Sequence, residues 1–483
     1  MEIGRNKNFY VNRYCRHSNV TGSMFLYSVH WPNGENVRFF VDAGAKQGED
    51  NIGFYNGFIP FDTKKINFGI ITHAHFDHVG LLPVLVRQGF NKKIYTSYPT
   101  ANILDIALYD STTVVDENLD EPIASRSDVE KTLDKVVGCF YKKVIKPHKN
   151  ISIIFYHNGH IVGAVLTLIV ITCPGEDDIT IIHTGDYKDR NIFFDVGIPD
   201  EKTRKLSISS FVCESTYGDV DSTDTKFNPC LEKNISTALK DEKTVILLSF
   251  SLGRHQEALY YLKTYKEKGI IPEDTLIVAD GGMSQQYTQR FRDVDLGLKP
   301  DMRDFIPKNT YSIPRTKNKN IIRRKIIEDS KPKVIVTSSG MGTNGAATKY
   351  LAHAIPRNDI LIHSLGYAAP NTAVDILLNT NNGQQINYNG IVLTKNCDVK
   401  KTSEISSHSP RDVLLNLIQM FVDIKSISLN HGEPFTTMLF WEYLLEHLNL
   451  TEEDIEICNP EYAVRIESTG ITDVFQSNFE SIL

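Results

Sequence analysis

The sequence predicts an α/β protein in which a layered sandwich of sheets and helices is interrupted by an inserted parallel α/β unit. Short apolar and β-branched runs separated by turns dominate the first 70 residues and return between residues 151 and 186. From about residue 219, buried strands alternate with glycine-rich loops and helices, which is typical of a parallel sheet. This alternation ends at about residue 404. We therefore expect three segments, residues 1–218, 219–404 and 405–483, of which the first and third form one domain.

The elements of the first segment are predicted in order. Strands are expected in "GSMFLYSV" (22–29) and "VRFFVDAG" (37–44), on either side of a turn in "HWPNGEN". A buried strand in "INFGIIT" (66–72) precedes a short helix in "VGLLPVLVRQG", which Gly89 ends. Residues 99–137 are expected to be mostly helical. Strands follow in "ISIIFY" (151–156), "AVLTLIVITC" (164–173) and "DITIIHTGD" (178–186).

The inserted unit shows a repeated strand, glycine loop and helix pattern. "TVILLSFSLGRHQEALYYLKTYKEKG" (244–269) predicts a buried strand followed by an amphipathic helix. "DTLIVADGG" and "PKVIVTSSGMG" predict strands that end in small-residue loops, and "NDILIHSLGYAAPNTAVDILL" repeats the pattern. In the last segment, "SSHSPRDVLLNLIQMF" (406–421) precedes a strand predicted in "IKSISLNHGEP" and a helix predicted in "FTTMLFWEYLLEHL".

Composition excludes some classes of protein. No apolar run approaches 20 residues, so no membrane span is expected. The seven cysteines are scattered without a Cys-x-x-Cys pair, which favours a reducing compartment, and we expect the cytoplasm. The net charge of −7 disfavours a dedicated nucleic-acid binder. Two basic segments, 141–150 and 315–325, are expected to be solvated surface, with a nucleic-acid patch as the alternative.

Four potential metal ligands follow the strand predicted at 66–72: His73, His75, Asp77 and His78 in "HAHFDH". Imidazole and carboxylate groups suit zinc or a similar divalent ion. His73 and His75 alternate along a tight loop and can point the same way. Asp77 and His78 begin the next helix and can serve a second ion. Since a two-metal site supplies both a nucleophile and a positive clamp for a phosphate ester, the cluster predicts a dinuclear metal hydrolase.

Further segments continue this pattern in an order that resembles the metallo-β-lactamase superfamily. "FFVDAG" places Asp42 at a strand end, "NGHIVGAV" contains His160, and "IHTGDY" contains Asp186. The candidate for the last histidine is His431 in "SLNHGEP", 245 residues after Asp186 (431 − 186). The predicted α/β insertion fills that gap.

The position of His431 and two more motifs narrow the resemblance to one branch of this superfamily. Glu214 lies in "CESTYG" and His408 in "EISSHSPRD", and both precede "LNHGE". Together with "SFSLGRHQEALYYL", "SSGMGTNGAA" and "LGYAAPNTA", these motifs resemble the β-CASP branch, which contains RNase J and the mRNA 3′-end-processing endonuclease. The resemblance covers roughly residues 18–435. It implies a metallo-β-lactamase αββα sandwich with an inserted parallel α/β β-CASP domain.

The resemblance also implies roles for the residues that match the motifs. Two divalent ions are implied per chain, with zinc preferred and manganese as the alternative. One ion would be held by His73, His75, His160 and Asp186, and the other by Asp77, His78, Asp186 and His431. Asp186 bridges the two ions and Asp42 orients ligands. His408 would act as general acid, held by Glu214, and Asp77 is counted with them as catalytic.

The implied reaction is hydrolysis of phosphodiester bonds in single-stranded RNA by a hydroxide that two metal ions activate. Endonuclease and 5′-exonuclease activity both stay open. The alternatives are a DNA-acting nuclease of the same branch, a small-molecule metallo-hydrolase, and a catalytically quiet subunit that binds RNA or a partner. The expected partner is a single-stranded nucleic acid, with RNA preferred. A homo-oligomer or assembly into an RNA-processing complex stays open.

Two glycine-rich loops are candidates for phosphate binding through their backbone N–H groups. The candidate residues in "SSGMGTNGAA" and "LGYAAPN" are Ser338, Ser339, Gly340, Gly342 and Gly366. The alternative is that these glycines only form strand-to-helix turns. Tyr217 or Tyr367 could stack on a base, with packing in the core as the alternative for each.

Overall fold

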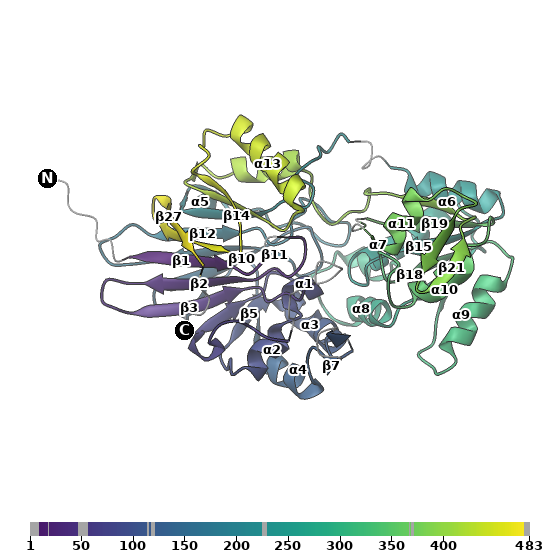
Figure 1. Ribbon diagram of the computed structural model, residues 1–483, viewed down its shortest axis with the longest axis horizontal. Helices are drawn as coiled ribbons and strands as arrows, with labels where there is room; N and C mark the ends of the chain where they lie inside the picture. The colour runs from purple at the N-terminus through teal and green to yellow at the C-terminus, as the bar shows by residue number, and fades with distance from the viewer. Residues whose placement is uncertain are drawn as a thin grey trace. The chain divides into compact units, whose positions relative to one another are not determined.

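The computed structural model describes residues 9–17, 19–46, 57–113, 115–116, 121–224, 229–366, 368 and 371–477. The chain divides into two compact units. Unit 1 comprises Met1–Ser222 together with His408–Leu483, and unit 2 comprises Thr223–Ser407. Figure 1 labels the elements of both units along the chain.

Unit 1 is built on two sheets. The larger sheet has eight strands in the order β27-β26-β1-β2-β3-β4-β5-β8. Their bounds, in that order, are Gly470–Gln476, Tyr462–Glu467, Tyr10–Cys15, Phe25–His30, Asn36–Val41, Phe68–Ile70, Ile94–Ser97 and Val136–Cys139. The strands β3, β4, β5 and β8 run parallel to one another. Their carboxyl ends therefore lie at one edge of the sheet.

The smaller sheet of unit 1 has seven strands in the order β25-β24-β14-β12-β11-β10-β9. Their bounds are Ile455–Ile457, Ile427–Asn430, Ser210–Glu214, Ile179–His183, Val165–Ile171, Ile151–His157 and Ile145–His148. β12, β14 and β24 are parallel neighbours, although more than 200 residues separate β14 from β24 (427 − 214 = 213). The two segments of unit 1 thus share one sheet.

The two sheets pack face to face, with helices on their outer faces. Phe39 and Phe68 of the larger sheet and Phe155 and Ile181 of the smaller sheet are fully buried between them. Period-two alternation places the neighbouring Phe40 on the opposite face, against Phe90. The helices of unit 1 are α1 (Phe76–Val79), α2 (Leu82–Arg87), α3 (Tyr98–Asp110), α4 (Arg126–Leu133), α5 (Glu201–Arg204), α12 (Arg411–Gln419) and α13 (Pro434–His447). Residues of α12 and α13 share a core with the outer face of the smaller sheet.

The first and last parts of the described chain are paired in the larger sheet. β1 lies between β2 and β26, and Val11 is opposite Ile466. The buried guanidinium of Arg13 donates to Ser428 Oγ at 2.7 Å and to Glu456 Oε2 at 2.5 Å. These bonds connect β1 of the larger sheet to β24 and β25 of the smaller sheet.

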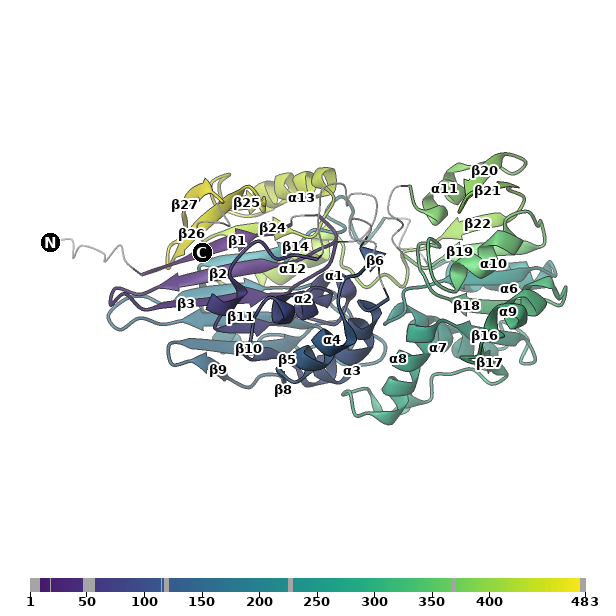
Figure 2. The ribbon, with the colours of Figure 1, turned by 60° about the horizontal axis from the view of Figure 1, so that its bottom comes forward.

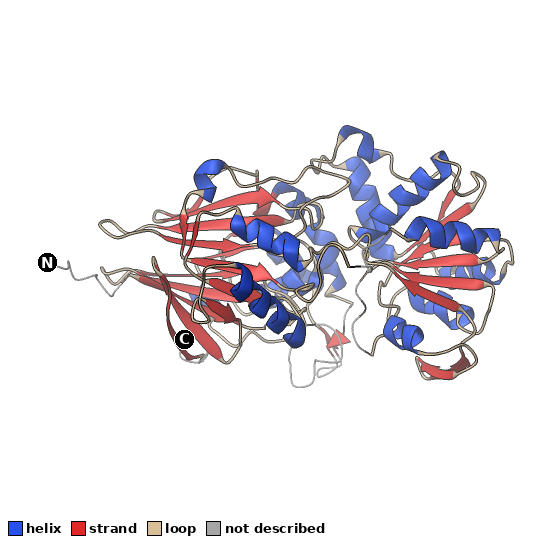
Figure 3. Ribbon diagram, turned by 90° about the horizontal axis from the view of Figure 1, so that it is seen from above, coloured by secondary structure: helices blue, strands red, loops and turns tan. Residues whose placement is uncertain are grey.

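Unit 2 is a parallel α/β unit. Its six-stranded sheet has the order β17-β16-β18-β15-β19-β22, and every neighbouring pair is parallel. The bounds are Thr310–Ser312, Leu276–Asp280, Lys333–Thr337, Thr244–Leu248, Ile360–Ser364 and Asp398–Lys401. Helices cover both faces of this sheet (Figure 3), as the burial of all residues in β15, β18 and β19 requires. They are α6 (Leu231–Lys240), α7 (Arg254–Glu267), α8 (Gly282–Asp293), α9 (Lys319–Glu328), α10 (Ala347–Ala354) and α11 (Ala373–Asn379).

The remaining strands form three short pairs: β6 (Val115–Asp116) with β7 (Glu121–Pro122), β13 (Ser207–Ile208) with β23 (Asp423–Ile424), and β20 (Gln385–Tyr388) with β21 (Ile391–Thr394). The predicted fold class is confirmed. The helical stretch predicted at 99–137 holds α3 and α4, but β6 and β7 lie between them and the strand β8 begins at Val136. In the part of the chain that is described, no helix combines the length and the apolar composition that crossing a membrane requires.

Candidate metal centre

The predicted ligands of the first motif lie on the loop and helix that follow β4. His73 is in the loop, His75 caps the amino end of α1, and Asp77 and His78 lie in α1. Asp42, which follows β3, holds this segment in place. Its Oδ1 accepts from the Thr72 backbone N–H at 2.7 Å, and its Oδ2 accepts from Thr72 Oγ1 at 2.7 Å and from His78 Nδ1 at 2.8 Å. The His78 ring is thereby oriented with Nε2 toward the centre of the site.

The loop after β3 and the segment before β2 also fix the position of α1. The backbone N–H of Ala43 donates to the carbonyl of His78 at 2.7 Å, and that of Ser23 donates to the carbonyl of Asp77 at 2.9 Å. Gly44 lies so close that a Cβ there would be 1.6 Å from the carbonyl oxygen of Asp77. Only glycine permits this approach, which holds the helix carrying two candidate ligands rigidly against the sheet.

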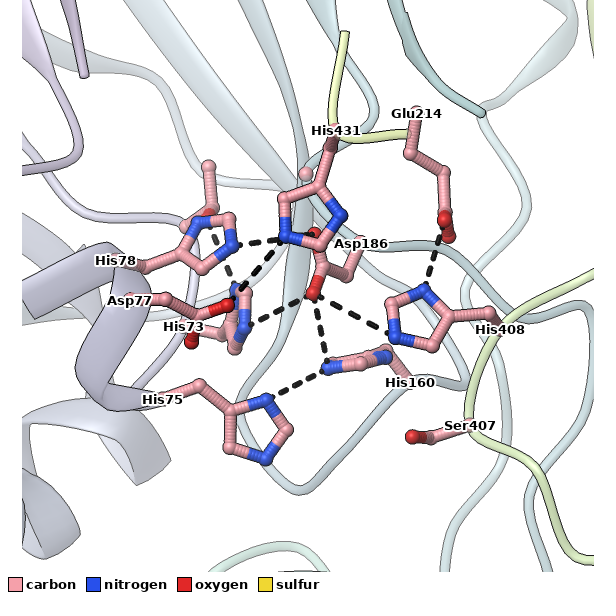
Figure 4. Close-up of polar contacts among 12 residues, drawn as sticks. His73, His75, Asp77, His78, His160, Asp186, Glu214, Ser407, His408 and His431 are labelled. Carbon is pink, nitrogen blue, oxygen red and sulfur yellow. Dashed lines mark hydrogen bonds and ion pairs between the residues drawn. The ribbon is translucent and has the colours of Figure 1, made fainter. Parts of the chain in front are cut away.

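The smaller sheet contributes the remaining candidate ligands. His160 lies between β10 and β11, Asp186 follows β12, and His431 follows β24 with a φ of 58°. In Figure 4 the imidazoles surround the carboxylate of Asp186. Its Oδ2 is 3.5 Å from His73 Nε2 and 3.4 Å from His160 Nε2. Its Oδ1 is 3.2 Å from His78 Nε2 and 3.4 Å from His431 Nε2.

These residues form two groups of potential ligands with Asp186 between them. The first group is His73, His75, His160 and Asp186, and the second is Asp77, His78 and His431. A third combination, Asp186 and His431 with His408, satisfies the same distance limit. Within each group the candidate ligand atoms lie within 4.8 Å of one another. The two oxygens of Asp186 face different groups. This is the arrangement expected of a carboxylate that bridges two ions.

The polar atoms at the centre fit a pair of bound cations. Among the described residues, four buried atoms at this centre have no hydrogen-bond partner: Nε2 of His73, His78 and His431, and Oδ1 of Asp186. His75 faces the centre with its other nitrogen, Nδ1, which is 3.0 Å from His160 Nε2. Buried polar atoms in proteins are normally hydrogen-bonded. Several such atoms that converge on one point therefore indicate a ligand, and imidazole with carboxylate is a donor set for a divalent metal ion.

The electrostatics of the cluster support the same conclusion. Burial lowers the pKa of His73 well below its usual value and that of His75 to about 4, so both rings are neutral, as metal ligands must be. The pKa of Asp186 lies well below its usual value despite burial, because the surrounding imidazoles attract its charge. The pKa values of His78 and His431 are raised despite burial, chiefly by Asp186. The buried carboxylates thus attract positive charge into the site.

His408 and Glu214 form a pair beside this centre. His408 Nδ1 is 2.7 Å from Glu214 Oε2, and His408 Nε2 is 3.9 Å from Asp186 Oδ2. The other oxygen of Glu214 accepts from the backbone N–H of Tyr187. Glu214 is buried, whereas the His408 side chain keeps 10% of its surface exposed. The geometry therefore leaves Nε2 of His408 as the atom that can meet a substrate.

The segment that carries His408 is attached to its surroundings at four consecutive residues. The backbone N–H of Ser409 donates to the carbonyl of Tyr187 at 2.9 Å, and Pro410 pairs with Tyr217. The guanidinium of Arg411 donates twice to Asp221, at 3.0 and 2.9 Å, and lies 4.3 Å from the ring centre of Tyr443. Asp412 accepts from Ser222 through both carboxylate oxygens.

Several of the supporting residues were not predicted from the sequence. Thr72 orients Asp42, and Thr216 Oγ1 lies 3.1 Å from His431 Nδ1. Thr72 directly precedes His73 and could have been noticed for that reason. The bidentate pair of Asp221 and Arg411 spans 190 positions, and nothing in the sequence links its members.

The candidate phosphate-binding residues all lie in unit 2, in loops at the carboxyl ends of parallel strands. Ser338, Ser339, Gly340 and Gly342 follow β18, and Gly366 follows β19. Ser339 Oγ is buried and has no hydrogen-bond partner among the described residues, which leaves it able to bind a ligand. A role in phosphate binding stays a prediction for all five. Tyr217 in unit 1 is buried edge-on against His408, and Tyr367 lies outside the described residues.

The fold and the centre together define a metallo-hydrolase of the αββα type, and comparison with known families specifies it. A metallo-beta-lactamase superfamily domain matches residues 33–191, and a Beta-Casp domain matches residues 255–376. The chain belongs to the β-CASP branch of the metallo-β-lactamase superfamily, as the motifs predicted.

Curated relatives and one solved structure agree with this assignment. The chain is 27% identical to cleavage and polyadenylation specificity factor subunit 3-II of Arabidopsis thaliana, over 86% of this chain and 67% of that protein. It is 26% identical to transcription termination factor FttA of Methanosarcina mazei, over 79% of this chain and 61% of that protein. It is 28% identical to a ribonuclease of Thermus thermophilus, over 68% of this chain and 74% of that protein. A protein of unknown function from Enterococcus faecalis has the same fold, with a TM-score of 0.50, 13% identity and coverage of 95% of this chain and 100% of that chain.

Proposed function

We propose that this protein is a metal-dependent ribonuclease that hydrolyses phosphodiester bonds in single-stranded RNA. The observation that carries the proposal is the pair of ligand groups on either side of the Asp186 carboxylate, with His408 Nε2 3.9 Å from it. The names of the Arabidopsis and Thermus relatives support RNA as the substrate. In this proposal unit 1 is the catalytic domain and unit 2 is the inserted β-CASP domain.

The two ligand groups would each hold one divalent ion. Zinc fits the first group best, because three imidazoles and one carboxylate form a common zinc donor set, and manganese is the alternative. Two ions bound here would supply a nucleophile at neutral pH and positive charge at the departing oxygen. Asp42 keeps the His78 ring aligned through its hydrogen bond to Nδ1, so that Nε2 remains free as a ligand atom.

His408 supplies the proton that the leaving oxygen needs. Glu214 Oε2 accepts from Nδ1, which fixes the ring orientation and leaves Nε2 to carry the transferable proton. Glu214 is itself held by the backbone N–H of Tyr187, so it cannot turn away from the ring. The partial exposure of His408 allows contact with a substrate, whereas His73 is completely buried.

The proposal is tested with purified protein that has been loaded with Zn²⁺ or Mn²⁺ and incubated with end-labelled and circular single-stranded RNA and DNA. We expect about two ions per chain by elemental analysis and cleavage of RNA. Cleavage of circular RNA would show endonuclease activity. Cleavage of DNA alone would assign the protein to DNA, and an inert protein across metals and substrates would refute the proposal.

Variants separate the role of His408 from that of the metal ligands. We expect His408→Ala to slow RNA cleavage about 10²- to 10⁴-fold while hydrolysis of bis(p-nitrophenyl) phosphate persists, because that leaving group needs no proton. Asp77→Asn should impair both reactions, since it removes a ligand. His353→Ala in unit 2 is the matched control and should retain both activities. If His408→Ala impaired both substrates equally, the assignment of His408 as general acid would be wrong.

A further inference from the structure

Unit 1 exposes a stacked pair of aromatic rings. The rings of Tyr98 and Phe140 are 5.6 Å apart between centroids and inclined by only 15°. Phe140 is 68% exposed and Tyr98 39% exposed. Single exposed apolar side chains are ordinary on protein surfaces. A stacked aromatic pair presents a flat apolar face to solvent, however, and such a face is suited to a planar ligand.

The aromatic pair lies at the same sheet edge as the metal centre. β4, β5 and β8 are parallel neighbours, and His73, Tyr98 and Phe140 follow their respective carboxyl ends. Figure 2 shows α3 beside β5 and β8. The start of this helix is close to β8, since a Cβ at Gly138 would be 3.3 Å from the Tyr98 Cα. A direct connection also exists, because Ser97 Oγ and Thr100 Oγ1 both donate to the carbonyl of Gly163, at 2.6 and 2.9 Å.

The hydrogen bonds to Gly163 connect the start of α3 to the loop that carries the candidate metal ligand His160. Gly163 is three residues after His160, and a Cβ at Gly163 would be 2.4 Å from Thr100 Oγ1. The amino end of α3, which carries Tyr98, is therefore held tightly against the His160 loop. The exposed rings and the metal centre thus belong to one rigid part of unit 1.

The segment after β8 holds Phe140 in place. The next residue, Tyr141, turns inward and stacks on His157 at 4.6 Å, and His157 stacks in turn on Phe194 at 4.2 Å. The backbone N–H of Lys142 donates to the carbonyl of Phe155 at 2.9 Å. The chain is thus anchored on both sides of Phe140, which limits the movement of its ring and reduces the entropic cost of binding.

The surroundings of the pair are positively charged. Residues 135–175 contain five lysines and no aspartate or glutamate, in a chain whose net charge is −7. Lys142, Lys143 and Lys146 are exposed. Within the described residues none of these three forms a salt bridge, whereas Lys149 lies 3.2 Å from Glu35. Lys142 interacts electrostatically with Asp200, whereas Lys143 and Lys146 are exposed and remain available to an anionic partner.

We propose that Tyr98 and Phe140 form a stacking platform for the bases of single-stranded RNA, with Lys142 and Lys143 binding its phosphates. Aromatic faces adjacent to exposed lysines are the combination that binds single strands without sequence preference. The inference rests on the proposed function, since it places the strand that unit 1 would cut. It also revises the expectation that residues 141–150 are only solvated surface.

The platform is tested by binding of fluorescein-labelled 20-nucleotide oligouridylate to the full chain in EDTA, which prevents turnover. We expect Phe140→Ala and Tyr98→Ala each to raise Kd about 5- to 100-fold, the range measured for loss of one stacked base. Lys142→Gln combined with Lys143→Gln should lower the slope of log Kd against log salt by about 1.4, or 0.7 for each phosphate that the variant no longer binds.

Two matched controls lie elsewhere in unit 1. Tyr462→Ala removes an exposed ring from β26, near the opposite end of the larger sheet, and should leave Kd unchanged. Lys64→Gln with Lys65→Gln removes two exposed lysines that precede β4, and should leave the salt slope unchanged.

The outcomes separate this inference from the proposed function. If Phe140→Ala bound RNA as tightly as the wild type while RNA was still cut, the platform would be refuted and the nuclease retained. The exposed pair would then serve another partner, such as a protein. If the wild type bound RNA through Phe140 but cut none, the platform would stand and the proposed function would fail. A wild type that neither bound RNA in EDTA nor cut it with Zn²⁺ or Mn²⁺ would refute both.

Discussion

Each unit buries an aspartate at the carboxyl end of a strand, and the two aspartates differ in the partners that surround the carboxylate. Asp280, the last residue of β16 in unit 2, accepts from Arg323 Nε at 2.6 Å, from Arg323 Nη2 at 2.9 Å and from Tyr350 Oη at 2.9 Å. Asp186 in unit 1 lies 3.2 to 3.9 Å from the nitrogens of five imidazoles, and among the described residues its Oδ1 has no hydrogen-bond partner. Burial alone does not distinguish a site from a structural contact. The distinguishing feature is whether the chain itself neutralises the buried charge.

The largest expected effect of a substitution is at Asp280, the aspartate whose charge the chain itself neutralises. Asp280→Asn should lower the free energy of unfolding of unit 2 by about 3–5 kcal/mol, because it leaves the buried guanidinium of Arg323 without a counter-ion. Hydrogen exchange followed by mass spectrometry over residues 223–407 would measure this loss. Both tryptophans, Trp31 and Trp441, lie in unit 1, so their fluorescence reports the unfolding of that unit alone.

The metal content of this variant is its control. We expect Asp280→Asn to bind two ions per chain, as the wild type should, since the substitution leaves unit 1 unaltered. An Asp280→Asn protein that was as stable as the wild type but inactive would contradict the comparison, because Asp280 would then belong to a functional site.

The second prediction concerns Asp186, whose charge is not neutralised by a lysine or arginine among the described residues. Asp186→Asn should lower the hydrolysis of RNA more than 100-fold, since loss of a residue that only supports a ligand already costs 10- to 100-fold. Elemental analysis should find fewer than two ions per chain. If Asp186→Asn kept both ions and its activity, the shared carboxylate would have no bridging role.

The sequence predicts most of the fold because strands and helices that are buried on a face leave a periodic pattern. It also groups the candidate ligands, since His73, His75, Asp77 and His78 are adjacent and His160, Asp186 and His431 each stand beside a glycine in a recurring order. Contacts between common residue types leave no such pattern. Three contacts show this: the pair of Asp221 and Arg411, the pair of Arg13 and Glu456, and the stack of Tyr98 on Phe140. In each, the two residues meet only because the fold brings distant segments together.

The third prediction concerns buried histidines that lack a carboxylate partner. Burial lowers the pKa of His363 to about 4, and its neutral ring is bonded on both sides, with Nδ1 3.2 Å from the carbonyl of Ser364 and Nε2 3.1 Å from Asn234 Nδ2. The unfolded chain has the usual histidine pKa of about 6.5, so between pH 6.5 and 4 it binds more protons than the folded chain. The stability due to neutral His363 is therefore complete above pH 6.5 and is lost as the pH falls toward 4.

The loss at pH 5 should be about 2 kcal/mol for this one histidine. Unfolding of unit 2 in denaturant at pH 7 and pH 5, followed by hydrogen exchange, would measure it. His363→Gln should show a smaller difference between the two pH values, and His353→Gln, which alters a half-buried ring, should match the wild type. An unchanged pH dependence in His363→Gln would mean that the ring is protonated in the folded chain.

The smallest expected effect concerns the position of His408. Arg411→Gln should lower kcat for RNA about 10-fold, because loss of the bidentate bond to Asp221 loosens the segment that orients the ring, and loss of an orienting partner costs at least that factor. KM and the metal content should stay unchanged. Asp221→Asn should have the same effect, and the double variant should be no slower than either single variant, because both substitutions break one interaction.

The choice of substrate shows whether Arg411 acts through His408. Hydrolysis of bis(p-nitrophenyl) phosphate should be unaffected in Arg411→Gln, since a misplaced general acid does not matter when the leaving group needs no proton. Arg411→Lys should restore only part of the lost kcat, because an ammonium cannot reproduce the two parallel bonds of a guanidinium. Equal losses on both substrates would show that Arg411 supports the metal centre or the fold instead. In that case the contacts of residues 409–412 would not be what orients His408. The ring would be positioned by the smaller sheet, which also carries Glu214.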